Sequence, residues 1–342
     1  ELETGMHHGE TLSEGRSFWH ANPYNASNGG PAGSPLEFFS NETAKKIYKD
    51  RLRYIIARWG YSTNILAWEF WNEIDHDKWS QDWDFVKKAV ASWHEEMGRH
   101  IREVDAYNHF ITTSFCTDNN RPLIWSKDVM DFIQGHSYGG RENMAIEALL
   151  MTNDLMPEYP FKPFFISEYG TSGWGYTKEG NAEETAIHNT IWATALSGAT
   201  GTAMWWWWDS IDENDLYRHY HYLHTFVKNI PWLNTKKLRI ETTNEETLAV
   251  GLSSQKQKAW VWIHNTNHNW KNAKDGTLIN SLENITVNIY GLENGKYSVQ
   301  EFDTYQGKIT SEQVVQSKET LDIQMKELDS DKAFIIKKIN NN

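Results

Sequence analysis

Two short hydrophobic segments of this sequence each lead into a carboxylate. The segments AWEFWNE at residues 67–73 and FFISEYG at residues 164–170 carry Glu73 and Glu168 behind apolar runs. Buried parallel strands of a barrel deliver reactive side chains from their carboxyl ends in this way. Two such acids can flank a glycosidic bond, where one protonates the leaving oxygen and the other attacks the anomeric carbon. The two segments therefore predict hydrolysis of glycosidic bonds.

Strand alternation predicts which side chains accompany these acids. Successive side chains point to opposite faces of a strand, so Glu69, Trp71 and Glu73 are expected on one face. The same rule places His136 and Tyr138 on the inward face of another strand, where they either contact the substrate or serve as hydrogen-bonded wall residues. A charge two positions below a strand end is buried and needs a partner such as an arginine, so we interpret Glu69 as structural.

The apolar runs also predict the elements that position these residues. From residue 1 to 233 they alternate with helical stretches, which is typical of βα units around a parallel sheet. Strands are predicted at about 2–7, 65–72, 110–115, 131–137, 163–168 and 201–207. Helices are predicted at about 41–59, 82–104, 142–151, 182–197 and 216–229, the first of them starting at Asn41. The fold class is therefore α/β, with an incomplete TIM-type (β/α) barrel of about six strands over residues 1–233.

The pattern changes after Pro231. Runs such as AWVWIH alternate with period two and are separated by turn signals. Strands are predicted at 247–251, 259–264, 285–290, 297–302, 321–325 and 333–336. Residues 234–342 are therefore predicted to form an antiparallel β-sandwich domain. Trp260 and Trp262 share one strand face, which predicts a place in the sandwich core or at a domain interface.

Composition narrows the class of partner. The 342 residues carry a net charge of −13, which argues against a nucleic-acid surface. No apolar stretch approaches the ~18 residues of a membrane span. The 18 tryptophans favour a carbohydrate cleft, because sugar rings stack their C–H faces on flat aromatic rings, although core filling explains any single one of them as well. Cys116 is the only cysteine, so no internal disulfide is expected.

Four motifs, taken in order, resemble those of a known enzyme family. They are similar to barrel strands four, six, seven and eight of the clan A (β/α)8 retaining glycoside hydrolases, and stand here as WNE at 71–73, HSY at 136–138, SE at 167–168 and the aromatic run ending at Trp208. The family 5 endoglucanase and mannanase type is the most similar. The segments WHANPYN at 19–25 and RYIIARWG at 53–60 resemble its larger bacterial members, which carry a C-terminal β-sandwich.

The resemblance implies a role for each matching residue. Glu73 would be the general acid/base and Glu168 the nucleophile of a retaining hydrolysis that needs no metal and no other cofactor. The remaining matches would line the substrate-binding rim: Asn72 at the sugar 2-hydroxyl, Tyr138 on the nucleophile, Trp208 as a stacking platform, and His136 and His8 beside them. The His7-His8 pair does not predict a metal site, because neighbouring strand residues face opposite ways.

The resemblance also implies a substrate and a location. We expect a polysaccharide or oligosaccharide with β-1,4 links, cellulose-like or mannan-like, with neither nucleic acid nor membrane as a partner. We also expect a secreted or periplasmic bacterial protein whose export signal lies upstream of this chain. The alternative function is a glycan-binding remnant or pseudoenzyme that keeps the aromatic cleft without turnover. The discriminating observation is the release of reducing sugar from a panel of β-glycans.

The amino terminus departs from the family pattern. If the WNE motif ends the fourth strand, residues 1–8 form the third, and the first two strands and the arginine that the family carries on strand two have no match. A barrel of this type closes with eight strands, so an open flank is expected. Parallel strands are normally buried on both faces. We therefore expect a second copy of the chain or a further N-terminal segment to cover the flank.

Overall fold

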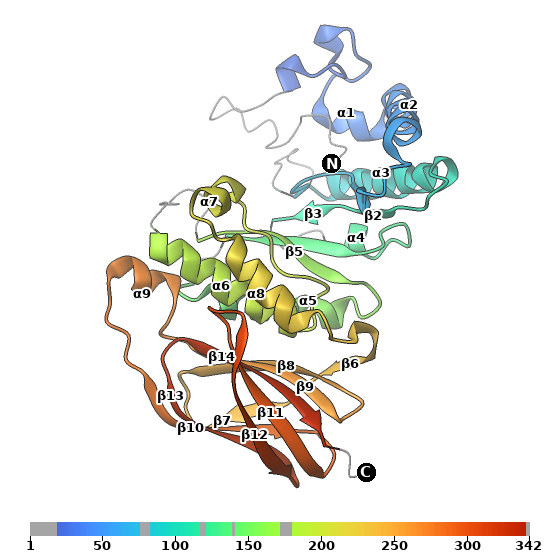
Figure 1. The fold of residues 1–342 in the computed structure, drawn as a ribbon. Helices are drawn as coiled ribbons and strands as arrows, with labels where there is room; N and C mark the ends of the chain where they lie inside the picture. Colours follow the sequence, from blue (N-terminus) through green and yellow to red (C-terminus); the bar gives the residue numbers. More distant parts are fainter. Residues whose placement is uncertain (1–18, 76–82, 117–120, 139–140, 172–179, 340–342) are drawn as a thin grey trace. The chain divides into compact units, whose positions relative to one another are not determined.

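The computed structural model describes residues 19–75, 83–116, 121–138, 141–171 and 180–339 (Figure 1). The chain divides into two compact units, residues 1–136 with 159–167 and residues 137–158 with 168–342. The strand predicted at 2–7 lies outside the described residues, as does His8.

The first unit combines short strands with the helices that follow them. Its helical elements are η2 (Trp19–Ala21), η3 (Ala26–Asn28), α1 (Pro35–Ser40), α2 (Glu42–Trp59), α3 (Trp83–Val104) and α4 (Arg121–Trp125). Its strands are β1 (Ala67–Glu69), β2 (Phe110–Thr112), β3 (Ser114–Phe115), β4 (Ile133–Ser137) and β5 (Phe164–Tyr169), of which the last two end in the second unit. β1 pairs with β2 in parallel, and β3, β4 and β5 form a second sheet in that order. The strands predicted between residues 65 and 168 and the helices predicted at 41–59 and 82–104 are confirmed, with shifted ends.

Asn41 starts α2 as expected. Its side-chain oxygen accepts hydrogen bonds from the N–H groups of Thr43 and Ala44, at 2.9 and 3.1 Å. This is the N-cap arrangement, which satisfies donors that a helix leaves open at its first turn.

The segment predicted as one strand at 110–115 is broken in the structure. β2 and β3 flank Thr113, whose hydroxyl donates a hydrogen bond to the carbonyl of Trp71 at 3.0 Å. The N–H of Ser114 donates to the same carbonyl, also at 3.0 Å. These contacts hold the residues that follow β1 close to β3.

Aromatic packing decides where the chain points after β1. Phe70 and Trp71 are both buried and both contact Trp93 of α3, with ring centroids 5.5 and 6.4 Å away. Strict alternation would send two neighbouring side chains to opposite sides of a sheet. The expectation that Glu69, Trp71 and Glu73 share one face is therefore wrong, because β1 ends at Glu69 and the aromatic core takes Trp71.

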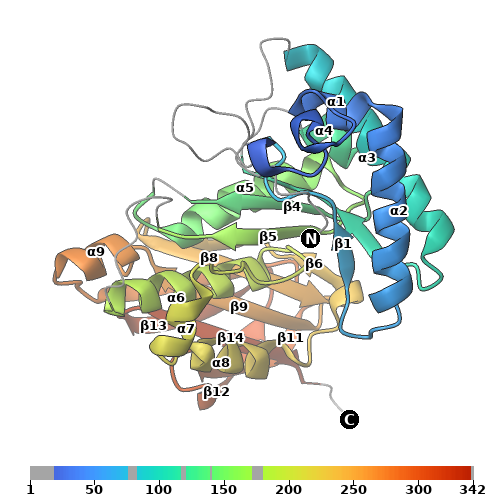
Figure 2. The ribbon, with the colours of Figure 1, turned by 90° about the horizontal axis from the view of Figure 1, so that it is seen from above.

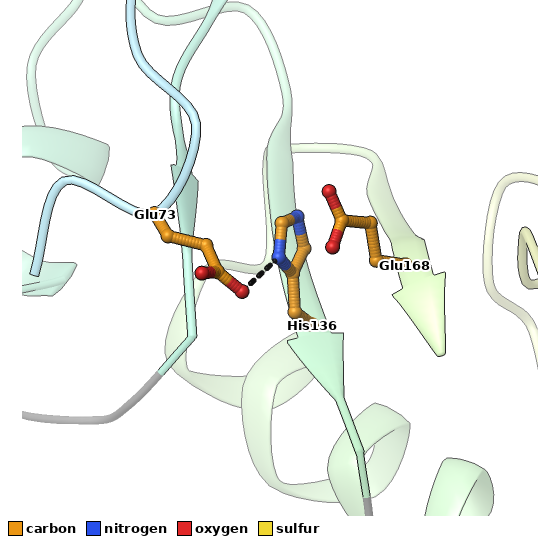
Figure 3. A group of neighbouring side chains, drawn as sticks. All are labelled: Glu73, His136 and Glu168. Atoms are coloured by element: carbon orange, nitrogen blue, oxygen red, sulfur yellow. Dashed lines mark hydrogen bonds and ion pairs between the residues drawn. The ribbon is translucent and has the colours of Figure 1, made fainter. Parts of the chain in front are cut away.

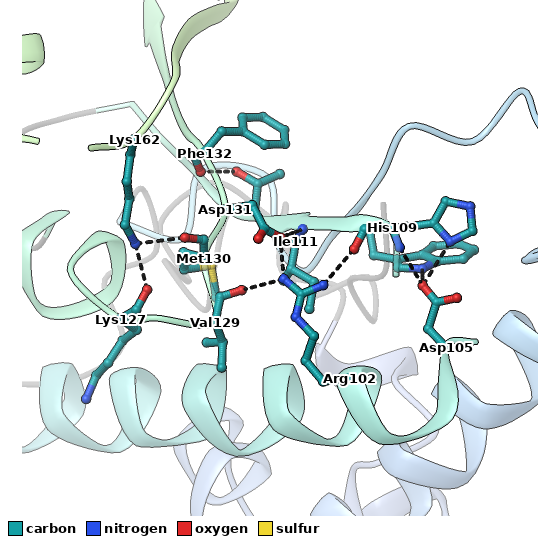
Figure 4. Close-up of polar contacts among 12 residues, drawn as sticks. Arg102, Asp105, His109, Ile111, Lys127, Val129, Met130, Asp131, Phe132 and Lys162 are labelled. Carbon is teal, nitrogen blue, oxygen red and sulfur yellow. Dashed lines mark hydrogen bonds and ion pairs between the residues drawn. The ribbon is translucent and has the colours of Figure 1, made fainter. Parts of the chain in front are cut away.

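A polar network fixes the starting ends of β2 and β4 (Figure 4). Arg102 of α3 forms an ion pair with Asp131, which also accepts a hydrogen bond from the N–H of Ile111 at 2.6 Å. The N–H of Asp131 donates to the carbonyl of Ile111 at 2.9 Å. Lys162, which precedes β5, donates to the carbonyl of Met130 at 2.8 Å. The network thus ties the amino ends of three strands to one helix and its loops.

The second unit contains the remaining helices and the antiparallel strands (Figure 2). Its helical elements are α5 (Met144–Glu158), α6 (Gly180–Leu196), α7 (Trp208–Glu213), α8 (Tyr217–Val227), η4 (Trp232–Asn234) and α9 (Trp270–Asp275). The helices predicted at 142–151, 182–197 and 216–229 are thus confirmed. α6 packs against α5, α8 and α9. Among all the helices described, none combines the length and the apolar character that crossing a membrane requires.

The strand predicted at 201–207 is reduced to one bridge. Trp205 pairs with Tyr169 in an isolated parallel bridge, and α7 begins at Trp208. The chain therefore turns into a helix before a ladder can form. Over the described part of the chain, the parallel strands form two separate sheets and no closed barrel.

Two antiparallel sheets make up the C-terminal part of the second unit. The strands are β6 (Thr235–Lys237), β7 (Ile240–Thr242), β8 (Thr247–Ser254), β9 (Lys258–Asn265), β10 (Leu282–Tyr290), β11 (Gly295–Asp303), β12 (Lys308–Ser317), β13 (Thr320–Leu328) and β14 (Asp331–Lys338). One sheet has the order β12-β11-β14-β9-β8-β6 and the other β13-β10-β7. All six predicted strands of this region are present, and Trp260 and Trp262 are buried as expected. β6 begins directly after η4 ends at Asn234, and the domain boundary at residue 234 stays a prediction.

A buried polar cluster joins α6 and α8 to the antiparallel strands within the second unit. The Nδ1 atom of His188 lies 2.9 Å from Nδ1 of His219, and its Nε2 atom lies 3.1 Å from the carboxylate of Asp331. The indole N–H of Trp262 donates to the same carboxylate at 2.5 Å. His264 of β9 is fully buried nearby, and burial lowers its pKa to about 3. The folded protein therefore keeps this imidazole neutral.

Replacing Arg102 should destabilise the first unit. Arg102→Met retains most of the apolar stem but leaves Asp131 without its charged donor. Both side chains are partly exposed, so the free energy of unfolding should fall by about 1–2 kcal/mol. Urea unfolding at neutral pH measures the change. The control is Arg99→Met on the same helix, because Arg99 is 66% exposed and pairs with Glu95 one turn away. Equal losses for the two variants would contradict the assigned role.

Acid should destabilise the second unit through His264. The unfolded chain binds a proton on this residue below its ordinary pKa of ~6.5, whereas the folded chain does not, so stability falls as the pH is lowered from there toward 3. His264→Gln keeps an acceptor for the Asn143 amide, which lies 3.0 Å from the ring nitrogen, but does not titrate.

The measurement is the slope of the free energy of unfolding against pH between 6 and 4. His264→Gln should reduce that slope by up to about 1.4 kcal/mol per pH unit. The exposed His221→Gln is the matched control and should leave it unchanged. An unaltered slope in the His264 variant would show that another group causes the acid sensitivity.

Candidate active site

Glu73 follows β1 and is held through both its backbone and its side chain. Its φ angle of 53° lies in the left-handed region, which residues other than glycine seldom adopt. Its N–H donates a hydrogen bond to the hydroxyl of Ser114 at 3.0 Å, and its side chain is only 8% exposed. Backbone strain of this kind persists only where the surroundings enforce it, and it occurs frequently at functional sites.

His136, near the end of β4, meets this carboxylate (Figure 3). Its Nδ1 atom lies 2.7 Å from Oε1 of Glu73, and its side chain is buried. Two residues earlier on the same strand, the amide of Gln134 donates to the carboxylate of Glu69 at 2.5 Å. Gln134 and His136, two residues apart on β4, thus both contact acids of the β1 segment, and the predicted inward face of this strand stays a prediction. The amide of Gln134 is thus one partner of the Glu69 carboxylate.

The acids Glu73 and Asp75 lie close to Cys116. The hydroxyl of Ser114 also donates to the side-chain oxygen of Asn72 at 3.4 Å, and Asp75 accepts from the N–H of Cys116 at 2.8 Å. Burial, followed by the charges of Asp75 and Glu73, holds the pKa of the Cys116 thiol well above its usual range. A thiol that stays protonated is a poor nucleophile.

Glu168 belongs to the second unit, where Tyr138 holds it. The phenol donates a hydrogen bond to Oε2 of Glu168 at 2.5 Å. A hydrogen bond donated to a carboxylate favours its ionised form and fixes its direction. The ring of Trp207 packs edge-on against Tyr138 with centroids 6.2 Å apart. It also fills the space at Gly170, where a Cβ atom would come within 2.2 Å of the indole, so only glycine fits there.

The run of four tryptophans divides between core and surface. Trp205 is buried, and its indole N–H donates to the carboxylate of Glu183 at 2.9 Å. Trp207 packs against Trp205 with ring centroids 5.3 Å apart. Trp206 and Trp208 are exposed by 49% and 75%. Trp205 is thus the buried member of the run, and the Trp208 ring is open to solvent.

Each unit brings together part of the predicted residue set. In the first unit, Glu73 and Asn72 both contact Ser114, and His136 contacts Glu73. In the second unit, Tyr138 contacts Glu168. His8 lies outside the described residues. The catalytic and binding roles of these residues stay predictions.

Sequence reasoning missed two residues that shape these surroundings, Ser114 and Trp207. Ser114 lies at the end of a predicted strand, as the acids do, so the same strand-end rule could have found it. Trp207 ends the strand predicted at 201–207, so the same rule could have found it, but its packing against Gly170 has no sequence signal.

The chain is distantly similar to glycoside hydrolases in sequence and in fold. No family model matches the chain. It is 24% identical over 226 residues to mannan endo-1,4-β-mannosidase 1 of Oryza sativa subsp. japonica, covering 51% of this chain and 49% of that protein. It is 25% identical over 154 residues to a probable mannan endo-1,4-β-mannosidase F of Aspergillus flavus, covering 44% and 30%. The chain thus spans less than half of either relative.

Solved structures extend the likeness to the fold. A glycoside hydrolase family 30 subfamily 8 xylanase from Clostridium acetobutylicum has a TM-score of 0.54 at 12% identity, covering 86% of this chain and 72% of that one. A family 44 endoglucanase, also from a Clostridium, has a TM-score of 0.50 at 12% identity, covering 85% and 70%. The predicted resemblance is confirmed at this level: the homologues are distant mannanases, the fold neighbours are clan A glycoside hydrolases, and antiparallel sheets follow the α/β part.

Proposed function

We propose that this protein is a retaining glycoside hydrolase that cleaves β-1,4-linked plant polysaccharide. The observation that carries the proposal is the pair of strand-end acids with different partners. Glu73 is buried against His136, and Glu168 accepts a hydrogen bond from Tyr138. Retaining hydrolysis needs one carboxyl group that delivers a proton and one carboxylate that attacks carbon, and unlike surroundings are what separate these roles.

The reaction has two steps. Glu168 attacks the anomeric carbon while Glu73 gives its proton to the leaving glycosidic oxygen, so one C–O bond forms as the other breaks. The product is a glycosyl ester on Glu168. In the second step Glu73 takes a proton from water, the water oxygen bonds to the anomeric carbon, and the ester bond to Glu168 breaks. Both acids return to their starting protonation states.

Neighbouring residues orient the acids and the sugar. His136 fixes the Glu73 side chain through its 2.7 Å contact, and Tyr138 keeps Glu168 ionised and directed. Asn72 hydrogen-bonds the sugar 2-hydroxyl. Trp208, 75% exposed, stacks against a sugar ring.

The relatives favour a mannan over other β-1,4-glycans, because both are named as mannan endo-1,4-β-mannosidases. A cellulose-like glucan is the second substrate to test. The proposal includes secretion to the outside or the periplasm, where such polymers are met. A glycan-binding protein without turnover is the competing function, and the release of reducing ends from mannan separates the two.

Removal of either acid should reveal its role. Glu168→Ala should abolish turnover, because no group remains to form the covalent intermediate. Glu73→Ala should lower kcat by about 10²–10⁴-fold on substrates with poor leaving groups, and much less on activated aryl glycosides. Added azide should restore part of the Glu73→Ala rate, because a small anion can attack the glycosyl ester without a general base. The assay is kcat on β-mannan and on aryl β-mannosides.

The control is Glu283→Ala, on the exposed face of β10, which should retain full activity. Equal loss on every substrate, with no azide rescue in either variant, would contradict the two roles. Azide rescue in Glu168→Ala alone would reverse them. Binding of mannan by the wild-type protein without release of reducing ends would favour the glycan-binding function.

A further inference from the structure

We propose that a pocket beside α2 in the first unit binds a carboxylate-bearing sugar, such as a uronic acid unit of a glycan. The pocket has a volume of about 480 Å³ and is lined by Pro23, Tyr24, Pro31, Ile47 and Arg51, with the backbone of Gly29 and Gly30. That volume lies in the range of small-ligand sites. The choice of a sugar rests on the proposed function, whereas the choice of an anion rests on the pocket alone.

The loop that forms one wall of the pocket is preformed. The N–H of Tyr24 donates to the side chain of Asn22 at 2.9 Å, and the N–H of Ala32 donates to the carbonyl of Tyr24, also at 2.9 Å. A Cβ atom at Gly30 would lie 2.2 Å from the Tyr24 backbone, so only glycine lets the two arms of the loop approach. A rigid wall lowers the ordering cost of binding.

The lining has the chemistry of an acidic sugar. Pro23, Pro31 and Ile47 provide apolar surface against which the C–H face of a pyranose can pack. Arg51 provides a guanidinium group, whose planar donors match a carboxylate. Burial raises the pKa of the Tyr24 phenol while Arg51 lowers it, and the net effect is upward, so the hydroxyl keeps its proton as a donor.

The charge on α2 also favours an anion. This helix carries six Lys and Arg residues against two acidic ones, in a chain whose net charge is −13. Lys45 and Lys49 are directed to Glu96 of α3, at 2.9 and 2.6 Å. Arg51 lies over the Tyr48 ring, 5.7 Å from its centroid, and lines the pocket. The pocket therefore lies beside a helix with an excess of positive charge, and Arg51 contributes a guanidinium group to its lining.

The outer face of α2 extends the site with aromatic rings. Ile47, Arg51, Tyr54 and Arg58 are spaced by four, three and four residues, so they follow one side of the helix. Tyr54 is 61% exposed, and its ring lies 6.1 Å from that of Trp59. Exposed aromatic surface next to a pocket provides stacking places for further sugar units.

The test compares methyl β-glucuronide with methyl β-glucoside, which differ in the carboxylate. Binding is measured by saturation-transfer difference NMR and calorimetry on the Glu168→Gln protein, which removes turnover from the experiment. The glucuronide should bind with a Kd of about 1 mM, and the glucoside at least about tenfold more weakly. Higher salt should weaken the glucuronide, because part of the attraction is between charges.

Three variants locate the ligand. Arg51→Gln should weaken glucuronide binding at least about tenfold, and Arg51→Lys should weaken it less, because the charge remains but the planar fork is lost. Arg53→Gln, two residues along the same helix and exposed, removes the same charge and should change binding less than about twofold. Thermal unfolding of each variant confirms that it is folded.

Several results would overturn the proposal. They are the absence of glucuronide binding, equal binding of the glucoside, equal loss in Arg51→Gln and Arg53→Gln, and equal binding of inorganic sulfate at the same ionic strength. None of these results bears on hydrolysis by Glu73 and Glu168, which is measured separately on neutral mannan. The two proposals can therefore fail independently.

Discussion

The cost of burying a carboxylate governs the arrangement of the first unit. An ionisable group removed from water must find hydrogen-bond partners or remain neutral, and Glu73 is almost fully buried. His136 contacts the Glu73 side chain, and the hydroxyl of Ser114 accepts a hydrogen bond from the Glu73 N–H. The left-handed backbone conformation of Glu73 costs about 1–3 kcal/mol by itself. His136 lies on β4, which begins two residues after Asp131, the ion-pair partner of Arg102. The burial of Glu73 therefore depends on the strand that places the imidazole and on the hydroxyl of Ser114.

The two acids are stabilised by different kinds of group, and this difference matters chemically. Glu73 faces an imidazole, which can donate or accept depending on its tautomer and charge. Glu168 faces a phenol, whose hydroxyl donates to the carboxylate. A partner of the first kind suits a group that changes protonation state twice per turnover. A partner of the second kind suits one that stays ionised until it forms a bond.

The sequence predicts those parts of the structure that local rules control. Helix α2 starts at Asn41 because an N-cap needs only its own first turn, and the core strands of the C-terminal sheets show period two because one face is buried. The rules fail where tertiary contacts decide. Trp71 follows the aromatic core rather than strand alternation, and residues 201–207 make a single bridge. β12 was missed because most of its residues are exposed, so it shows no apolar alternation.

The tryptophan excess has two physical explanations rather than one. Several buried indoles are anchored through their N–H groups: Trp68 to Asp105, Trp125 to the Thr113 carbonyl, Trp205 to Glu183 and Trp262 to Asp331. An indole that fills a core and also satisfies an acid stabilises packing and charge together, which an aliphatic side chain cannot do. Trp206 and Trp208 instead face solvent, where an aromatic ring gains nothing from burial in the folded chain. Their exposure separates them from the indoles that stabilise the fold, and it leaves ring faces of the kind that the proposed sugar stacking requires.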